Sequence, residues 1–232
     1  MNPIPAKTFF ERFHNTWLQH LHLLLSQLSA APKPTSPEDH RYLSQLADRV
    51  MTHYEDYYRI KSHAAKHDVL AMFSAPWTTS LESSLHWIAG WRPTTVFHIV
   101  YTESSVRFEA QIVDLLRGHR TGDLGDLTPR QLTRVSELQC QTVREENEIT
   151  EELSQWQNNS CDLVSPSANM EANIERLVEV LEKADDLRLK TLRRVVEILT
   201  PQQAVEFLIA TAEVQLGIRG WGLEKDRKRE SM

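Results

Sequence analysis

Two opposite charges lie on a helix face that the sequence predicts to be apolar. Steps of three and four residues along this face lead from Tyr57 to Lys61 and on to Asp68. An unpaired charge in an apolar interior is costly, so both side chains need partners. One hypothesis is that Lys61 and Asp68 form the polar floor of a ligand pocket. The alternative is a structural charge network that ties this helix to Arg92 or Glu82.

Three of the six tryptophans fall in one short segment that also contains a Gly-Trp-Arg-Pro turn. Large aromatic side chains can line an apolar cavity or anchor a protein partner. Packing at the corner between two helices is the simpler use of such residues. The sequence therefore gives one set of candidates for a pocket or a partner surface: Tyr57, Lys61, Asp68, Trp77, Trp87, Trp91 and Arg92.

Catalytic and metal-binding motifs are absent from the sequence. His63 and His67 share a helix face, but no Glu follows His63 to give H-E-x-x-H, and no third ligand is evident. The sequence contains no P-loop, no G-x-S-x-G, no G-x-G-x-x-G and no C-x-x-C. These observations favour an interaction module over an enzyme, with no catalytic residue and no metal site.

Composition narrows the class of protein further. The net charge of -6 is a poor match for nucleic acid as a partner. Cys140 and Cys161 do not make a disulfide framework, which favours a reducing compartment such as the nucleus or cytoplasm. The longest apolar run is far shorter than the ~20 residues of a membrane helix, so no membrane association is expected.

Glycine, proline and capping residues divide the chain into long helices. Thr79, Thr128 and Thr200 are each followed three residues later by Glu or Gln, as in a capping box. No hairpin signal appears. We predict an all-α, single-domain helical bundle of about six to eight helices, several of them long. The expected helices are 7–30, 38–73, 80–89, 93–117, 129–158, 169–199 and 201–217. Residues 1–6 are predicted to be a flexible N-terminus, 7–222 the domain, and 223–232 a charged flexible tail.

The first helix offers a second candidate surface. Its apolar stripe runs from Phe10 to Leu28 and must be covered by the rest of the bundle. The Pro-rich linker 32–37 is its connection to the next helix. Its opposite face is then free to bind a partner through Glu11, Asn15, His22 and Gln27.

Three blocks of the sequence carry a family resemblance. The first is Phe10 to Phe13 with Trp17 to Leu21. The second contains His53-Tyr54, Lys61, Ala65, Asp68-Val69, Trp77, Glu82, Trp87-Ile88, Gly90 and Arg92-Pro93. The third is Ala184 to Arg188, Thr191-Leu192, Ile198 to Thr200 and Gln203-Ala204. Together they resemble the Delay of Germination domain of seed dormancy proteins, which is related to the C-terminal domain of TGA-type bZIP transcription factors.

The resemblance implies a nuclear or cytosolic regulator that binds other proteins. Implied partners are type 2C protein phosphatases of abscisic acid signalling, or transcriptional coactivators. It also implies haem binding through C-terminal histidines, but no histidine follows His119. No basic helix or heptad run precedes the domain, so DNA binding is not expected without a bZIP partner.

Three functions follow from the sequence. The leading one is a non-enzymatic plant regulator of dormancy or transcription that acts by protein contact. The alternatives are a ligand-sensing helical module that binds haem or a fatty acid near the tryptophans, and a DNA-binding factor of TGA type. The leading interpretation includes no resident cofactor. A homo-oligomer is a further hypothesis.

Overall fold

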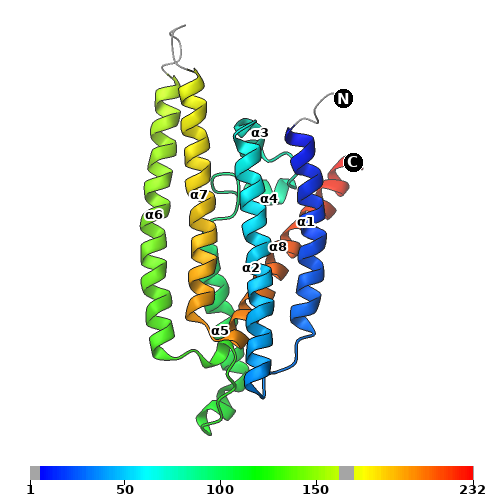
Figure 1. The fold of residues 1–232 in the computed structure, drawn as a ribbon, viewed down its shortest axis with the longest axis vertical. Coiled ribbons are helices and arrows are strands. Elements are labelled where there is room, and N and C mark those ends of the chain that lie inside the picture. Colours follow the sequence, from blue (N-terminus) through cyan, green and yellow to red (C-terminus); the bar gives the residue numbers. More distant parts are fainter. Residues whose placement is uncertain (1–5, 162–169, 232) are drawn as a thin grey trace.

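The computed structural model describes residues 6–161 and 170–231, and within these ranges the chain forms eight α-helices and one 3-10 turn (Figure 1). The elements are α1 Ala6–Ser29, α2 Pro37–Ala65, α3 Val69–Ser74, α4 Ser80–Ser84, α5 Thr95–Leu116, η1 Leu124–Asp126, α6 Pro129–Cys161, α7 Met170–Ile198 and α8 Pro201–Glu230. No strand occurs in the described ranges, and the predicted all-α, single-domain bundle is confirmed.

The long helices run side by side along the long axis of the molecule (Figure 1). Helix α2 is the centre of the bundle, because it packs against α1, α7 and α8. Helix α6 packs mainly on α7, and the two form a hairpin at one side. Helix α5 and η1 pack on each other near the end of the molecule where α7 ends and α8 begins (Figure 1).

Capping chemistry sets the helix starts as the sequence predicts. The Glu82 N–H donates to the Thr79 hydroxyl at 3.2 Å, and the Thr79 N–H donates to the Glu82 carboxylate at 2.7 Å. The same reciprocal pair forms between Thr128 and Gln131, and between Thr200 and Gln203. Each pair satisfies backbone donors that a helix start otherwise leaves without partners. All three predicted capping boxes are confirmed.

The core consists of two apolar clusters joined along α1 and α2. One contains Trp17, Leu21, Leu46, Val50, Phe97 and Leu208, and the other contains Phe10, Met72, Trp77, Ala184 and Leu187. The predicted stripe of α1 is confirmed, because Phe10, Trp17, Leu21 and Leu28 are buried and Phe13 and Leu24 pack against them. This stripe fixes α1 against α2 and α8.

Two predicted helix boundaries are wrong. The helix expected over 38–73 ends at Ala65, and α3 begins at Val69. The reason is that the Asp68 carboxylate accepts a hydrogen bond from the Ala71 N–H at 3.0 Å, which caps a new helix. The helix expected over 80–89 stops at Ser84, and an irregular loop follows.

The expected charged tail also differs from the structure. Helix α8 continues to Glu230, so residues 223–230 are helical. Asp226 accepts hydrogen bonds from the backbone N–H of Ser80 at 3.0 Å and from its hydroxyl, which fastens this segment to α4. The predicted flexible residues 1–6 lie outside the described residues, apart from Ala6 at the start of α1.

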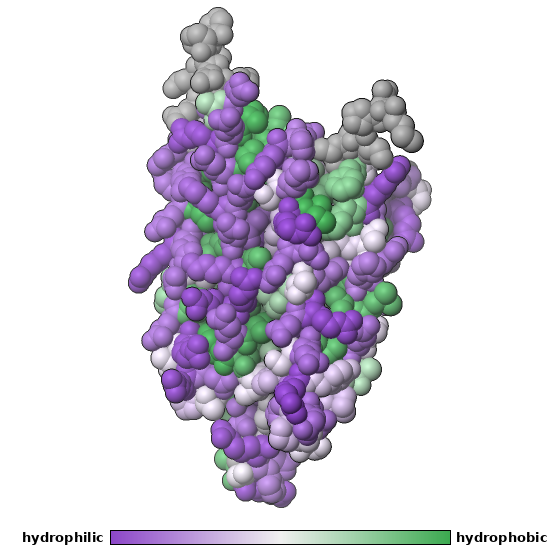
Figure 2. Space-filling model, in the orientation of Figure 1, coloured by the Kyte–Doolittle hydropathy of each residue, from purple (hydrophilic) through white to green (hydrophobic). Residues whose placement is uncertain are grey.

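The molecular surface in the same orientation is mainly hydrophilic, and hydrophobic side chains show between the helices (Figure 2). No helix in the described ranges combines the length and the apolarity needed to cross a membrane.

Candidate functional site

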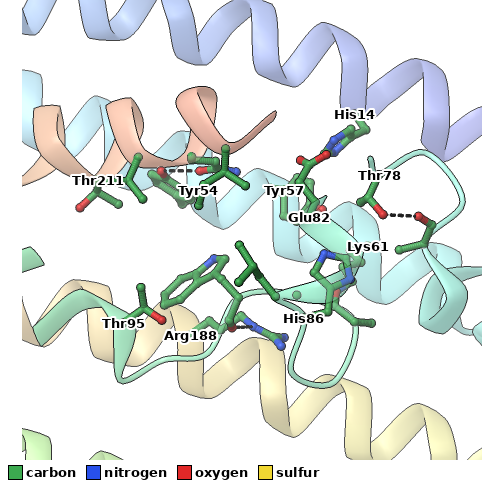
Figure 3. A pocket seen from close by; sticks show the side chains of 18 of the residues that line it. His14, Tyr54, Tyr57, Lys61, Thr78, Glu82, His86, Thr95, Arg188 and Thr211 are labelled. Carbon is green, nitrogen blue, oxygen red and sulfur yellow. Dashed lines mark hydrogen bonds between the residues drawn. The ribbon is translucent and has the colours of Figure 1, made fainter. Parts of the chain in front are cut away.

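A pocket of about 150 Å³ lies between α1, α2, α8 and the segment from Ala75 to Ile99 (Figure 3). Four of the seven candidate residues line it, namely Tyr57, Lys61, Trp77 and Trp91. The structure therefore brings the tryptophan segment and the buried lysine to one place. Asp68, Trp87 and Arg92 are not among its lining residues.

Lys61 is paired, but with residues that the sequence did not suggest. Its side chain is 2% exposed, and Nζ donates to the Asp185 carboxylate at 3.0 Å and to the Ala89 carbonyl at 2.9 Å. Asp185 also accepts from Arg188, one turn further along α7. Burial lowers the pKa of Lys61 to about 8. The predicted charge network exists, and it ties α2 to α7 rather than to Arg92 or Glu82.

Arg188 determines the shape of the loop that carries two of the tryptophans. Its side chain is 0% exposed, and Nε donates to the Trp91 carbonyl at 2.6 Å. Its Nη2 donates to the carbonyls of Trp87 and, at 2.8 Å, Ile88. These bonds and the bond from Lys61 to Ala89 satisfy carbonyls in a segment that has no helical partners for them. The buried arginine thus supplies hydrogen bonds that backbone N–H groups would supply in a helix.

The backbone of this loop is strained where the arginine holds it. Ile88 and Ala89 have φ angles of 45° and 56°, in the left-handed region that side chains with a Cβ rarely adopt. A Cβ at Gly90 would lie 3.0 Å from Cζ of Arg188, so a larger residue would push against the guanidinium. The glycine is needed here for close approach.

The inward placement of Asp68 is wrong. Asp68 is exposed, and its carboxylate caps α3 instead of facing Lys61. The helical step from Lys61 fails because α2 has ended at Ala65. A polar floor made by Lys61 and Asp68 is therefore excluded.

Trp87 and Arg92 connect the loop to the α6–α7 hairpin. The Trp87 indole N–H donates to the Thr150 hydroxyl at 3.0 Å, and Arg188 lies 5.3 Å from the centre of its ring. Arg92 donates to the buried Glu146 carboxylate at 2.8 Å. Both side chains position the segment from outside the pocket.

His14 was missed by the sequence analysis. It is 4% exposed, lines the pocket, and has no hydrogen-bond partner for either ring nitrogen among the described residues. Burial is the main reason that its pKa falls to about 3, and the charges of Arg219 and Lys61 lower it further. The available signal was its place four residues after Phe10, on the apolar stripe of α1.

A second histidine lines the same pocket. Burial lowers the pKa of His86 to about 4, and the positive charges of Lys61 and Arg188 add to this effect. Both imidazoles are therefore neutral at pH 7, and each has one N–H to donate.

The pocket of about 150 Å³ is too small to enclose a porphyrin, because pockets that enclose even drug-sized ligands measure ~300–1,000 Å³. His63 and His67 are exposed, with ring centres 5.0 Å apart. The described residues contain no group of three His, Cys, Asp or Glu side chains arranged to hold a metal.

The outer face of α1 is exposed as predicted. Glu11, Asn15, His22 and Gln27 are all accessible. Asn15 accepts a hydrogen bond from Arg219 at 3.2 Å, so it also helps to fasten α1 to α8.

Comparison with known proteins gives one consistent result. The family model DOG1, described as seed dormancy control, matches residues 21–102. The chain is 33% identical to Protein DOG1-like 4 of Arabidopsis thaliana in an alignment of 230 positions that covers 92% of this chain and 91% of that protein. It is 26% identical to Protein DOG1-like 3 of the same plant, over 84% of this chain and 76% of that protein. It is also 25% identical to Transcription factor TGA2 of Arabidopsis thaliana, over 87% of this chain and 59% of that protein.

Proposed function

Because this chain belongs to the DOG1 seed dormancy control family, we propose that it is a non-enzymatic plant regulatory protein that acts by binding other proteins. The proposed role is in dormancy control linked to abscisic acid, or in transcription regulation, in the nucleus or cytoplasm. The proposed partners are type 2C protein phosphatases or transcriptional coactivators.

The observation that carries this proposal is an exposed apolar face on α5. Five large apolar side chains in eleven residues are at least 42% exposed: Val106, Phe108, Ile112, Val113 and Leu116. Helix α5 packs on η1 and α8 through its other side, where Arg107 contacts Glu206 and Gln111 donates to Asp123. Contiguous exposed apolar surface is typical of protein interaction sites. We name these five residues the α5 face.

The outer face of α1 is the second proposed surface. Its four polar residues, Glu11, Asn15, His22 and Gln27, are exposed beside Phe9 and Leu23, which are 49% and 58% exposed. An interface that combines exposed apolar and polar groups here matches the usual composition of non-obligate contacts.

Paired surface variants test the proposal. Ile112→Glu with Leu116→Glu removes the α5 face, and Glu11→Arg with Gln27→Glu changes α1. Val143→Glu is a matched control, because Val143 is an apolar residue of α6 that is 39% exposed. Binding of a purified type 2C phosphatase and of a coactivator is measured by biolayer interferometry, with folding checked by circular dichroism.

We expect the α5 variant to raise the Kd for the partner by about tenfold or more. A tenfold change in Kd equals ~1.4 kcal/mol of binding free energy, which is what the loss of one buried apolar side chain at an interface typically costs. The control should bind as the wild type does. If folded variants of both surfaces bind as well as wild type, neither surface is the interface. If wild type binds neither class of partner, the proposed partner classes are wrong.

Autonomous DNA binding is not part of the proposal. The net charge of -6 opposes contact with phosphates, and this chain aligns with about six-tenths of Transcription factor TGA2. We expect equal affinity for a TGACG duplex and a scrambled duplex in a salt-titrated shift assay. A clear preference for TGACG would favour a TGA-type function instead.

A further inference from the structure

The pocket has one end where ionisable side chains gather and another that is less polar. His14, Tyr57, Lys61, Glu82 and His86 lie at the first, polar end, whereas Tyr54, Thr95 and Thr211 lie towards the other (Figure 3). The proximity of the polar groups is also seen in the effect of Lys61 on both histidines and in the 5.9 Å between the ring centres of His14 and Tyr57.

The apolar end is formed by aromatic and branched side chains. Trp91, Val96 and Ile99 line the pocket in the same segment as Thr95. A ligand that fits both ends must carry a compact apolar body and one polar group.

Buried charge beside the polar end is positive. Lys61, Arg188 and Asp185 are 2%, 0% and 4% exposed, so two cations share one carboxylate. The carboxylate of Glu82 is already paired with Arg219 at 3.2 Å. A net positive charge held away from water favours an anion in the adjacent pocket.

Hydrogen-bond donors are available for such an anion. Lys61 has three N–H groups, and two of them have protein partners. His14 has none, although it is almost fully buried, and a buried polar group without a partner is costly. A carboxylate at this end would accept from the N–H of His14 and from the third N–H of Lys61.

The size of the pocket limits the rest of the ligand. An apolar cavity of ~150 Å³ holds one aromatic ring. A long acyl chain or a porphyrin exceeds the space.

We propose that this pocket binds a compact aromatic monocarboxylate, with the carboxylate between His14 and Lys61 and the ring against Trp91, Val96 and Ile99. Such a ligand contacts α1, α2, α8 and the loop at once, so its binding stabilises their mutual packing. The proposal does not depend on the partner surfaces on α1 and α5, and partner binding without ligand tests those separately.

Isothermal titration calorimetry with three probes tests the ligand class. Benzoate is the expected type, benzamide has nearly the same shape without the charge, and decanoate has the charge on a long chain. We expect benzoate to bind at millimolar concentrations or below, and benzamide to bind at least about tenfold more weakly. Equal binding of benzoate and benzamide, tighter binding of decanoate, or no benzoate binding by folded protein would each overturn the proposal.

Two variants locate the site. Ile218→Trp fills part of the pocket from a half-buried position on α8, and Val143→Trp adds the same ring on the outside of α6. His14→Phe keeps the ring and removes the donors. Ile218→Trp should abolish benzoate binding, His14→Phe should reduce the preference for benzoate over benzamide, and Val143→Trp should change neither. Benzoate binding that survives in a folded Ile218→Trp protein would place the ligand elsewhere and overturn the assignment.

Discussion

Replacement of Arg188 by methionine is the most direct test of how the tryptophan loop is held. The substitution keeps a long apolar stem but removes the guanidinium, which has 0% exposure and donates to Asp185 and to the carbonyls of Trp87, Ile88 and Trp91. Removing one member of a buried, hydrogen-bonded ion pair costs ~3–5 kcal/mol. Each buried carbonyl left without a donor costs up to ~1–3 kcal/mol before the loop relaxes.

These costs do not add fully. Lys61 still neutralises Asp185 after the substitution, and water can reach carbonyls once the loop moves. We therefore expect a loss of ~3–5 kcal/mol of unfolding free energy out of the ~5–15 kcal/mol typical of a domain. For a chain of this length each kcal/mol lowers Tm by ~2–4 °C, which gives a decrease of roughly 6–20 °C.

Urea denaturation followed by tryptophan fluorescence and circular dichroism measures the loss. Arg193→Met is the control on the same helix, because Arg193 pairs with Glu55 at an exposed site and such pairs contribute under ~1 kcal/mol. If Arg188→Met unfolds within ~0.5 kcal/mol of wild type, the arginine does not hold the loop, and the reasoning is refuted.

The remaining predictions concern other parts of the same framework. Lys61→Met breaks a buried ion pair and should lower the free energy of unfolding by ~3–5 kcal/mol. Asp68→Ala removes an exposed helix cap and should lower it by only ~0.5–2 kcal/mol. A lower melting temperature for Asp68→Ala than for Lys61→Met would contradict the structure. Gly222→Ala should cost ~1–3 kcal/mol in urea, because the new Cβ would lie 2.1 Å from the Thr79 hydroxyl, whereas Gly220→Ala has open space and should stabilise the protein by up to ~1 kcal/mol. The pKa of His14 is about 3 in the folded protein against 6.5 when unfolded, so only the unfolded state takes up that proton between these pH values. The contribution of neutral His14 to the free energy of unfolding should be full above pH 6.5 and should fall by up to ~1.4 kcal/mol per pH unit as the pH decreases below 6.5. His14→Phe should therefore flatten the dependence of the unfolding free energy on pH, measured between pH 7 and pH 5.

Local chemistry in the sequence was sufficient to predict most of the fold. A capping box is complete within four residues, so Thr79, Thr128 and Thr200 marked three helix starts that the structure confirms. The stripe of α1 likewise depends on one periodicity, and its large members are buried. Such local signals can be interpreted without knowing which other helix packs against the segment.

The errors have two causes, a competing local signal in one case and a long-range contact in the other. Asp68 fits both a continuing helix face and a new N-cap, and the cap is formed. Helix α8 continues past Gly217 and Gly220, and Asp226 on this extension binds the start of α4, a contact between residues 146 positions apart. Sequence periodicity alone cannot detect such a partner.

The site was predicted only in part for the same reason. Tyr57, Lys61, Trp77 and Trp91 line the pocket, and all four belong to the segment that the sequence emphasised. Asp185 and Arg188 were recognised as part of a family block, but their pairing with Lys61 requires α2 and α7 to be docked. His14 lies on the apolar stripe of α1, and the sequence pattern does not show that its ring is buried without a hydrogen-bond partner.

The long sequence separations within the site have a consequence for how the protein is made. The bond from Lys61 to Asp185 joins residues 124 positions apart, and the bond from Arg188 to Ile88 joins residues 100 apart. Closing such large loops costs entropy that is repaid only when the contacts form, so they belong to the late, slow part of folding. During synthesis α2 and the loop leave the ribosome long before α7 and α8. The nascent chain therefore exposes its tryptophans until residues through α8 are available, and this interval is when chaperones have the most apolar surface to recognise.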